Sequence, residues 1–154
     1  MILTLDLGLK TGFAIGLDGI LIESGVLKLP NKKSGEKFFF FNKWLEEKHS
    51  EKSFKLIAFE HVNFIGNRTS PCSAHAYGGY LAFLESFAYK EAIPTKRLTV
   101  REIKKGISGK SNCDKSEIIK NVNEAGIQVT DDNEADAIAI FLLINKNYTG
   151  NHVN

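Results

Sequence analysis

Three acidic residues stand where strongly apolar segments begin or end, and this placement predicts a metal site. Asp6 interrupts the apolar run at the N-terminus, Glu60 ends a second run, and Asp136 precedes a third. A carboxylate in apolar surroundings is costly unless a positive group meets it. Hard cations such as Mg²⁺ and Mn²⁺ take oxygen ligands. Two of them ~4 Å apart can activate a water and stabilise the leaving oxygen of a phosphodiester. The predicted chemistry is therefore phosphodiester hydrolysis.

A fourth acid is expected from the segment before Asp136. Asp132 lies four residues before it and Asn133 three, so either can share a helix face with it. Asp131 and Asp132 can also cap the helix, and we expect this of at least one of them. Each acid near a helix N-terminus gains only ~0.3–1 kcal/mol from the dipole. That gain does not account for several buried acids meeting.

The three acids also have ordinary structural explanations. Asp6 could cap the turn that Gly8 and Gly12 form, and Glu60 could pair with a nearby lysine at a strand end. The N-terminal residues alone support a metal-ligand role and a turn-capping role for Asp6 about equally. A structural explanation is weakest for Asp136, because alanines flank it and the following helix is apolar almost all round.

A basic segment between positions 96 and 120 is suited to phosphate contacts. The net charge of the whole chain is only +2, so the local excess of lysine and arginine is the relevant signal. A basic, solvated helix face is the commoner origin of such a run. Its basic members are Lys96, Arg97, Arg101, Lys104, Lys105, Lys110, Lys115 and Lys120.

Length and composition are typical of one globular domain. The chain has 154 residues, of which 43% are hydrophobic and 25% charged. We expect a single domain over residues 1–147 and a polar tail over 148–154. No apolar run approaches the ~20 residues of a membrane span, and the N-terminus lacks a signal-peptide pattern. Cys72 and Cys113 read as reduced thiols, so a cytoplasmic protein is predicted.

Hydrophobic periodicity predicts the elements that position the acids. Three strands joined by short turns predict an antiparallel meander, and a later, nearly continuous apolar strand is typical of a buried central position. The expected strands cover residues 1–6, 13–17, 20–29, 55–61 and 95–100. The expected helices cover 36–48, 72–91, 114–125 and 137–144, with a basic helix start and loop after position 100. This order predicts an α/β fold with a mixed five-stranded sheet.

Aromatic residues in the first expected helix are interpreted as packing groups. Phe38, Phe41 and Trp44 fall at helical spacing, and Phe39 and Phe40 widen the stripe. The helix over 72–91 also carries small residues that allow close packing. It is our candidate for a face that contacts another subunit.

The chain resembles the RuvC family of Holliday junction resolvases, and more closely its short bacteriophage and prophage members. The similarity covers nearly the whole chain. Each motif alone is weak, but four of them occur in the family's order and spacing. They are Asp6-Leu-Gly8 with Thr11-Gly12; Glu60-His-Val; Ile103-Lys104-Lys105 with Gly109 and Cys113-Asp114-Lys115; and Asp132-Asn-Glu-Ala-Asp136-Ala-Ile-Ala.

This resemblance implies an RNase H-like fold with helices on both faces of the sheet. It also implies a homodimer that cuts four-way DNA junctions by paired symmetric nicks, with two Mg²⁺ or Mn²⁺ ions per site. Asp6, Glu60 and Asp136 correspond to metal ligands. Where bacterial members carry the fourth acid this chain has Asn133, so Asp132 is expected to replace it, with a neutral oxygen of Asn133 as the alternative. Neither a membrane nor a nucleotide cofactor is expected.

The resemblance also assigns DNA contacts in the basic segment. Lys104 and Lys115 match basic positions near the scissile phosphate, and Lys115 is expected to take part in catalysis by offsetting phosphate charge. Lys105 and Lys110 are further phosphate contacts. Contacts of this kind give affinity and salt dependence without sequence choice.

The loop after Glu60 corresponds to junction-facing residues of bacterial members. Phe64, Asn67 and Arg68 are therefore expected to contact DNA. Phe64 could stack on an unpaired base or simply anchor the loop.

Other functions share these acids. A different RNase H-like nuclease could act on forks, flaps or structured RNA, and an inert junction-binding module could retain the fold. Sugar kinases and actin-like ATPases also begin with Asp-x-Gly, but they need two such domains, which 154 residues cannot hold.

Overall fold

Five strands form one mixed sheet in the order β3-β2-β1-β4-β5. The first three strands pair antiparallel, whereas β4 lies parallel to β1 and β5 lies parallel to β4. The computed structural model describes residues 1–29, 34–62 and 70–150. The predicted meander joined to parallel strands is confirmed. The strands are β1 (Ile2–Asp6), β2 (Gly12–Leu17), β3 (Ile20–Val26), β4 (Leu56–Glu60) and β5 (Thr95–Leu98).

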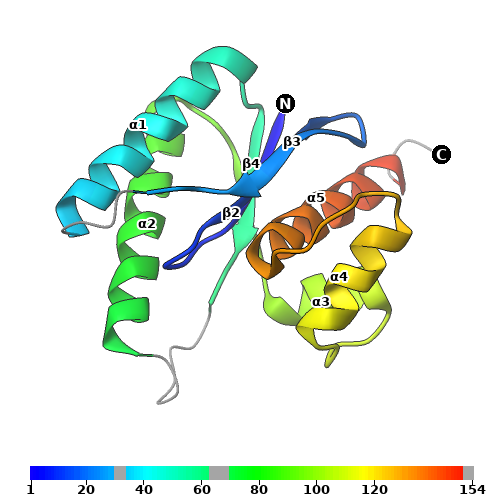
Figure 1. Cartoon of the computed structure of the whole chain (residues 1–154). Helices are drawn as coiled ribbons and strands as arrows, with labels where there is room; N and C mark the ends of the chain where they lie inside the picture. Colours follow the sequence, from blue (N-terminus) through cyan, green and yellow to red (C-terminus); the bar gives the residue numbers. More distant parts are fainter. Residues whose placement is uncertain (30–33, 63–69, 151–154) are drawn as a thin grey trace.

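Helices cover both faces of this sheet, as expected. In Figure 1, α1 and α2 lie to the left of the sheet, and α3, α4 and α5 lie to its right. The helices are α1 (Ser34–Lys52), α2 (Pro71–Lys90), α3 (Val100–Ser108), α4 (Lys115–Glu124) and α5 (Asp132–Gly150). Within the described residues, no helix is both long and apolar enough to cross a membrane.

The last helix differs most from its predicted bounds. It begins at Asp132 and continues to Gly150, whereas the sequence predicted a helix over 137–144 and a polar tail. Asn145, the first residue beyond the predicted end, forms hydrogen bonds with both ends of its side-chain amide. Its Nδ2 donates to the Phe141 carbonyl (2.8 Å), and its Oδ1 accepts from the Gly19 amide (3.1 Å). The domain limit at residue 147 stays a prediction.

The basic segment also contains more helix than predicted. Val100–Ser108 forms α3, which starts at a capping box between Thr99 and Glu102. It ends where Gly109 takes a left-handed conformation with φ 77°. A complete helix therefore replaces the expected helix start and loop, and it fixes the direction of each lysine that it carries.

Two apolar clusters flank the sheet. One packs α1 and α2 against it, and the other packs α3, α4 and α5. The predicted burial of the last helix is confirmed, since Ala137, Ile138 and Ile140 are almost completely buried. The expectation that Phe39 and Phe40 widen the core stripe is wrong, because they are 62% and 39% exposed. They lie on the side of α1 that faces away from the sheet.

Candidate active site

The ends of two parallel strands bring the first two acids together. Leu5 of β1 lies opposite Phe59 of β4, so the next residues, Asp6 and Glu60, leave the sheet at the same edge. Both strands are buried up to this point, while the two carboxylates are only partly covered. The backbone ladder therefore places Asp6 beside Glu60.

The third acid comes from the start of α5, which packs across the same sheet edge. Asp131 caps this helix, because its Oδ1 accepts hydrogen bonds from the amides of Asn133 (2.9 Å) and Glu134 (3.2 Å). Asp136 follows one turn later. The expectation that one of the two preceding acids serves as a helix cap is therefore confirmed for Asp131.

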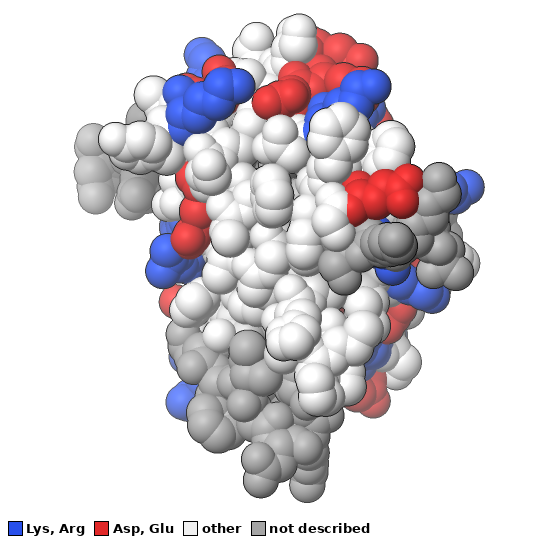
Figure 2. Space-filling view, turned by 90° about the vertical axis from the view of Figure 1, so that its left-hand side faces the viewer, with Lys and Arg blue, Asp and Glu red and all other residues white. Residues whose placement is uncertain are grey.

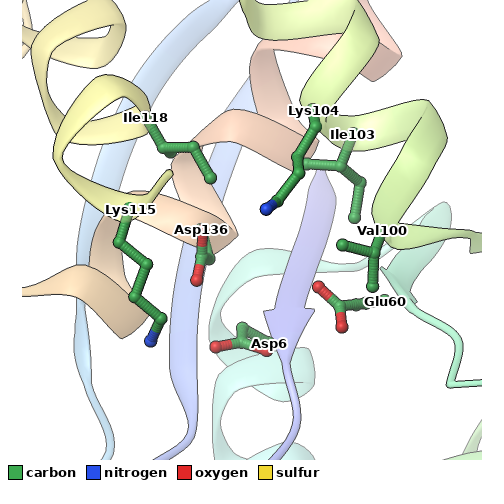
Figure 3. Close-up of a pocket in the computed structure, with 8 residues that line it drawn as sticks. All are labelled: Asp6, Glu60, Val100, Ile103, Lys104, Lys115, Ile118 and Asp136. Carbon is green, nitrogen blue, oxygen red and sulfur yellow. The ribbon is translucent and has the colours of Figure 1, made fainter. Parts of the chain in front are cut away.

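The three acids line one cavity of about 260 Å³. Their carboxylates and the amino groups of Lys104 and Lys115 point toward the same space (Figure 3). Five charged side chains and three aliphatic ones form the wall of the cavity. Its lining consists of Asp6, Glu60, Val100, Ile103, Lys104, Lys115, Ile118 and Asp136.

Burial and mutual repulsion disfavour the charged forms of these carboxylates. Loss of hydration, with Glu60 and Asp136 nearby, raises the pKa of Asp6 to about 8. Loss of hydration raises the pKa of Asp136 to about 6, although Lys115 opposes the shift. The pKa of Glu60 is raised by the same burial and by Asp136. Such shifts occur where several acids share a site that a cation can complete.

The two lysines reach the cavity from different helices. Lys104 of α3 donates from Nζ to the Cys113 carbonyl (2.6 Å) at the wall of the cavity. Lys115, the first residue of α4, forms an ion pair with Asp132. Their hydrogen bond raises the pKa of Lys115 and lowers that of Asp132. The ion pair with Asp132 thus holds the Lys115 amino group as a cation beside the acids.

The remaining predicted residues of the α5 start lie beside the cavity and not in its wall. Asp132 pairs with Lys115 and is not part of the lining. Asn133 donates from Nδ2 to Asp131 (3.2 Å) and Asp132 (3.0 Å). Both bonds use the amide nitrogen, so the neutral oxygen of Asn133 stays the predicted alternative for the fourth ligand. The ligand role of Asp132 stays a prediction.

The other predicted DNA contacts are dispersed. Lys105 lines a separate hollow together with Lys96 and Glu102, so it faces away from the acids. Lys110 forms an exposed ion pair with Glu117 (3.4 Å). Phe64, Asn67 and Arg68 lie outside the described residues.

Two neighbours of the acids were not predicted from the sequence. The Tyr77 hydroxyl of α2 accepts a hydrogen bond from the Val62 amide (3.0 Å) and lies 3.5 Å from His61 Nδ1. This contact holds the chain where it leaves β4, directly after Glu60. The sequence showed Tyr77 only as a core residue at helical spacing. Thr4, a buried polar residue on β1, carried no signal beyond its strand.

The donor set suits a hard divalent cation. Within the described residues, no three acidic, histidine or cysteine side chains already converge closely enough to hold an ion. The three carboxylates instead surround a cavity, supply only oxygen donors, and have raised pKa values that added positive charge would lower. The residues present therefore fit Mg²⁺ or Mn²⁺.

Comparison with solved structures identifies the fold. RuvC of Thermus thermophilus in complex with a Holliday junction substrate matches with a TM-score of 0.79, over 97% of this chain and 95% of that one. The chain has the RuvC fold. A second Thermus thermophilus RuvC structure matches with a TM-score of 0.76, over 97% and 96%. The yeast mitochondrial Holliday junction resolvase Ydc2 matches with a TM-score of 0.66, over 98% and 80%.

The RuvC fold is retained here at low sequence identity. The three structures are 20%, 19% and 12% identical to this chain, respectively. No protein-family model matches the sequence, and no curated protein matches it. The comparisons therefore confirm the RNase H-like fold of RuvC and Ydc2, and the role of each residue rests on the geometry of the cavity.

Proposed function

We propose that the protein is a divalent-metal-dependent endonuclease that resolves four-way DNA junctions by paired nicks. The observation that carries this proposal is the cavity of three carboxylates and two lysines at one edge of a RuvC-type sheet. The relatives that share the fold include a RuvC bound to a Holliday junction. The more specific resemblance to bacteriophage members remains a proposal from the sequence motifs.

Asp6, Glu60 and Asp136 would hold the metal ions. A bound pair of Mg²⁺ or Mn²⁺ ions supplies Lewis acidity, which lowers the pKa of a water and stabilises the leaving oxygen. The carboxylates would bind and orient this charge, and Val100 and Ile103 line the cavity beside them. We further propose that Asp132 becomes the fourth ligand when Lys115 turns from it toward a phosphate.

The lysines would position the DNA backbone. Lys115 and Lys104 lie at the cavity, so they can offset the charge of the scissile phosphate there. Lys105 and Lys110 lie farther away and would contact phosphates of the flanking duplex. We propose Phe64, Asn67 and Arg68 as contacts near the branch point, on the basis of their place in the sequence after Glu60.

Paired nicks require two sites, and the outer face of α1 and α2 is our candidate for a homodimer surface. The centre of this face is largely free of charge (Figure 2). Phe39 is 62% exposed, and Phe40 and Phe83 are each 39% exposed. Exposed apolar groups of this size favour a protein contact. A second copy would cover them and place two identical cavities on one DNA junction.

A cleavage assay on labelled DNA tests the proposal. The wild-type protein would be incubated with a four-way junction, a fork, a flap and a hairpin RNA, in Mg²⁺, Mn²⁺ or chelator. We expect paired, metal-dependent nicks near the branch point of the junction. Preferred cleavage of the fork, flap or RNA would instead establish a different RNase H-like nuclease. Metal-independent binding without cleavage would leave a junction-binding module.

A further inference from the structure

Thr4 makes a buried hydrogen bond between the sheet and α5. Its side chain is completely buried on β1. Its hydroxyl lies 2.7 Å from the Ala137 carbonyl of α5 and 3.3 Å from the Ala14 carbonyl of the neighbouring strand β2. A hydroxyl has one proton, so the shorter contact to Ala137 is the stronger hydrogen bond.

Both ends of this hydrogen bond lie next to cavity acids. Thr4 is two residues before Asp6, and alternate residues of a strand point to the same face. Ala137 directly follows Asp136. One contact therefore joins the segment that carries the first acid to the segment that carries the third.

The backbone of α5 also lies directly on β2 at this end of the sheet. Gly12 pairs with Asp6 in the β1–β2 ladder. A Cβ atom at Gly12 would lie 1.9 Å from the Asn133 carbonyl oxygen, a separation that no side chain tolerates. The absent side chain lets the first turn of α5 approach the strand, and the Thr4 hydroxyl then contacts the helix one turn farther along.

The three acids differ in what holds them. Asp6 and Glu60 are held by the ladder of two adjacent parallel strands. Asp136 belongs to a helix that rests on the sheet mainly through apolar packing, which is non-directional. Its other hydrogen bonds to the β2–β3 region go through the side chains of Glu134 and Asn145. A hydrogen bond to a defined carbonyl is directional, so it restricts sliding and rotation of α5 where packing does not.

We propose that the Thr4 hydroxyl is a positioning group that sets the spacing between the Asp6 and Asp136 carboxylates by fixing the first turns of α5 on β1. This inference rests on the proposed function for its effect on metal binding and cleavage. A helical carbonyl keeps a second lone pair for such a contact. Loss of the hydroxyl therefore leaves the helix able to form and removes its alignment.

The test compares three variants of the full chain. Thr4→Val keeps the shape and removes the hydroxyl, whereas Thr4→Ser keeps the hydroxyl. Ser24→Ala is the matched control, because Ser24 also donates a 2.7 Å hydrogen bond from a strand to α5. Its acceptor is the Glu134 side chain, which is not part of the cavity lining. Thermal unfolding confirms that each variant is folded.

Calorimetric titration with Mn²⁺ and junction cleavage are the first two readouts. Misplaced ligands typically cost ~10- to 100-fold in metal affinity or activity. We expect about a 10-fold loss of both in Thr4→Val. Thr4→Ser and Ser24→Ala should stay within about threefold of the wild type. If Thr4→Val does not fold, Thr4→Cys replaces it, because a thiol is only a weak donor.

The amide NMR shifts of the metal-free protein keep the two proposals distinguishable. We expect Thr4→Val to move the Asp136 and Asp6 signals and Thr4→Ser to leave them near their wild-type positions. Unchanged signals and unchanged Mn²⁺ affinity in Thr4→Val would overturn the positioning role. If Thr4→Ser changed the amide signals and the Mn²⁺ affinity as much as Thr4→Val, the positioning role would also be overturned. The shape of the side chain, and not its hydroxyl, would then determine the position of α5. A wild-type protein that neither binds Mn²⁺ nor cleaves DNA would refute the proposed function, and the NMR comparison would still decide the role of Thr4.

Discussion

Asp136 and Asp132 lie one turn apart on the same helix, yet their surroundings act on them in opposite directions. Burial raises the pKa of Asp136 to about 6. The hydrogen bond from Lys115 lowers the pKa of Asp132. Spacing along α5 brings both residues to one side of the helix, but burial and partners determine what each carboxylate does.

The same contrast separates the cavity acids from the acids that start helices. Asp114 accepts hydrogen bonds from Ser116 (2.7 Å) and the Glu117 amide (2.8 Å), and these bonds lower its pKa. Slight burial raises the pKa of Asp131, but hydrogen bonds from Glu134 and Asn133 lower this pKa overall. Charged capping acids stabilise the folded state through their hydrogen bonds, whereas the charged forms of Asp6 and Asp136 destabilise it because they are buried. The cavity therefore favours a cation.

Removal of a cavity acid gives the largest expected effect. We expect Asp6→Asn to lower junction cleavage by about 10³-fold or more, because a ligand of the reacting centre is lost. Asp131→Asn is the matched control, since it removes a charge from the α5 cap while asparagine still caps well. Cleavage by Asp131→Asn should stay near the wild-type rate in the same gel assay. Equal cleavage by Asp6→Asn would remove Asp6 from the site.

The stability of the metal-free protein should fall with rising pH. The pKa of Asp6 is about 8 in the fold and 3.8 in an unfolded chain, so the folded state retains a proton that the unfolded state releases. Its contribution to stability is complete below pH ~4 and is lost progressively as the pH approaches 8. Urea unfolding at pH 4.5, 6 and 8 measures this trend. Asp6→Asn should show a flatter profile, differing by on the order of a few kcal/mol, and an identical profile would contradict the assigned pKa.

Lys115 and Lys120 test which cations of α4 belong to the site. Lys115 lines the cavity, while Lys120 pairs with Glu124 (3.7 Å) on an exposed helix face. Lys115→Gln should weaken junction binding and reduce the salt slope of the affinity by about one. Lys120→Gln should change the slope much less. A wild-type slope for Lys115→Gln in a binding titration across salt concentrations would show that Lys115 does not contact a phosphate.

Asp132→Asn should reduce cleavage much less than Asp6→Asn. If Asp132 becomes the fourth ligand, cleavage should fall about 10-fold, because three carboxylates remain. The same loss should appear in Mn²⁺ affinity, whereas Asn133→Ala should retain both. A larger loss in Asn133→Ala than in Asp132→Asn would assign the fourth oxygen to Asn133.

The sequence was sufficient to predict the sheet and three cavity acids, because carboxylates beside long apolar runs are visible without a structure. For the lysines, the residue pattern gave only a basic segment, and the family resemblance separated Lys104 and Lys115, which line the cavity, from Lys105 and Lys110. Lys104 and Lys105 are adjacent, but successive residues of a helix point ~100° apart, and the complete helix α3 was not recognised. Lys104 therefore lines the cavity while Lys105 faces another hollow.

Contacts between segments far apart in the sequence account for the other features of the site that the sequence did not predict. Asp132 shares a helix face with Asp136 as predicted, but its partner Lys115 comes from α4 and cannot be inferred from spacing. Thr4 looks like an ordinary strand residue, and only the packing of α5 on β1 reveals the acceptor of its hydroxyl. Local patterns thus indicate which groups are chemically capable, and the tertiary fold determines their partners.

Calorimetric titration of Mn²⁺ at pH 8 tests the central claim most directly, because it measures what the cavity acids bind without requiring the correct DNA. We predict clear binding by the wild type, little or none by Asp6→Asn, and wild-type binding by Asp131→Asn. Equal Mn²⁺ binding by the wild type and Asp6→Asn, or none by a folded wild type, would contradict a metal site formed by Asp6, Glu60 and Asp136.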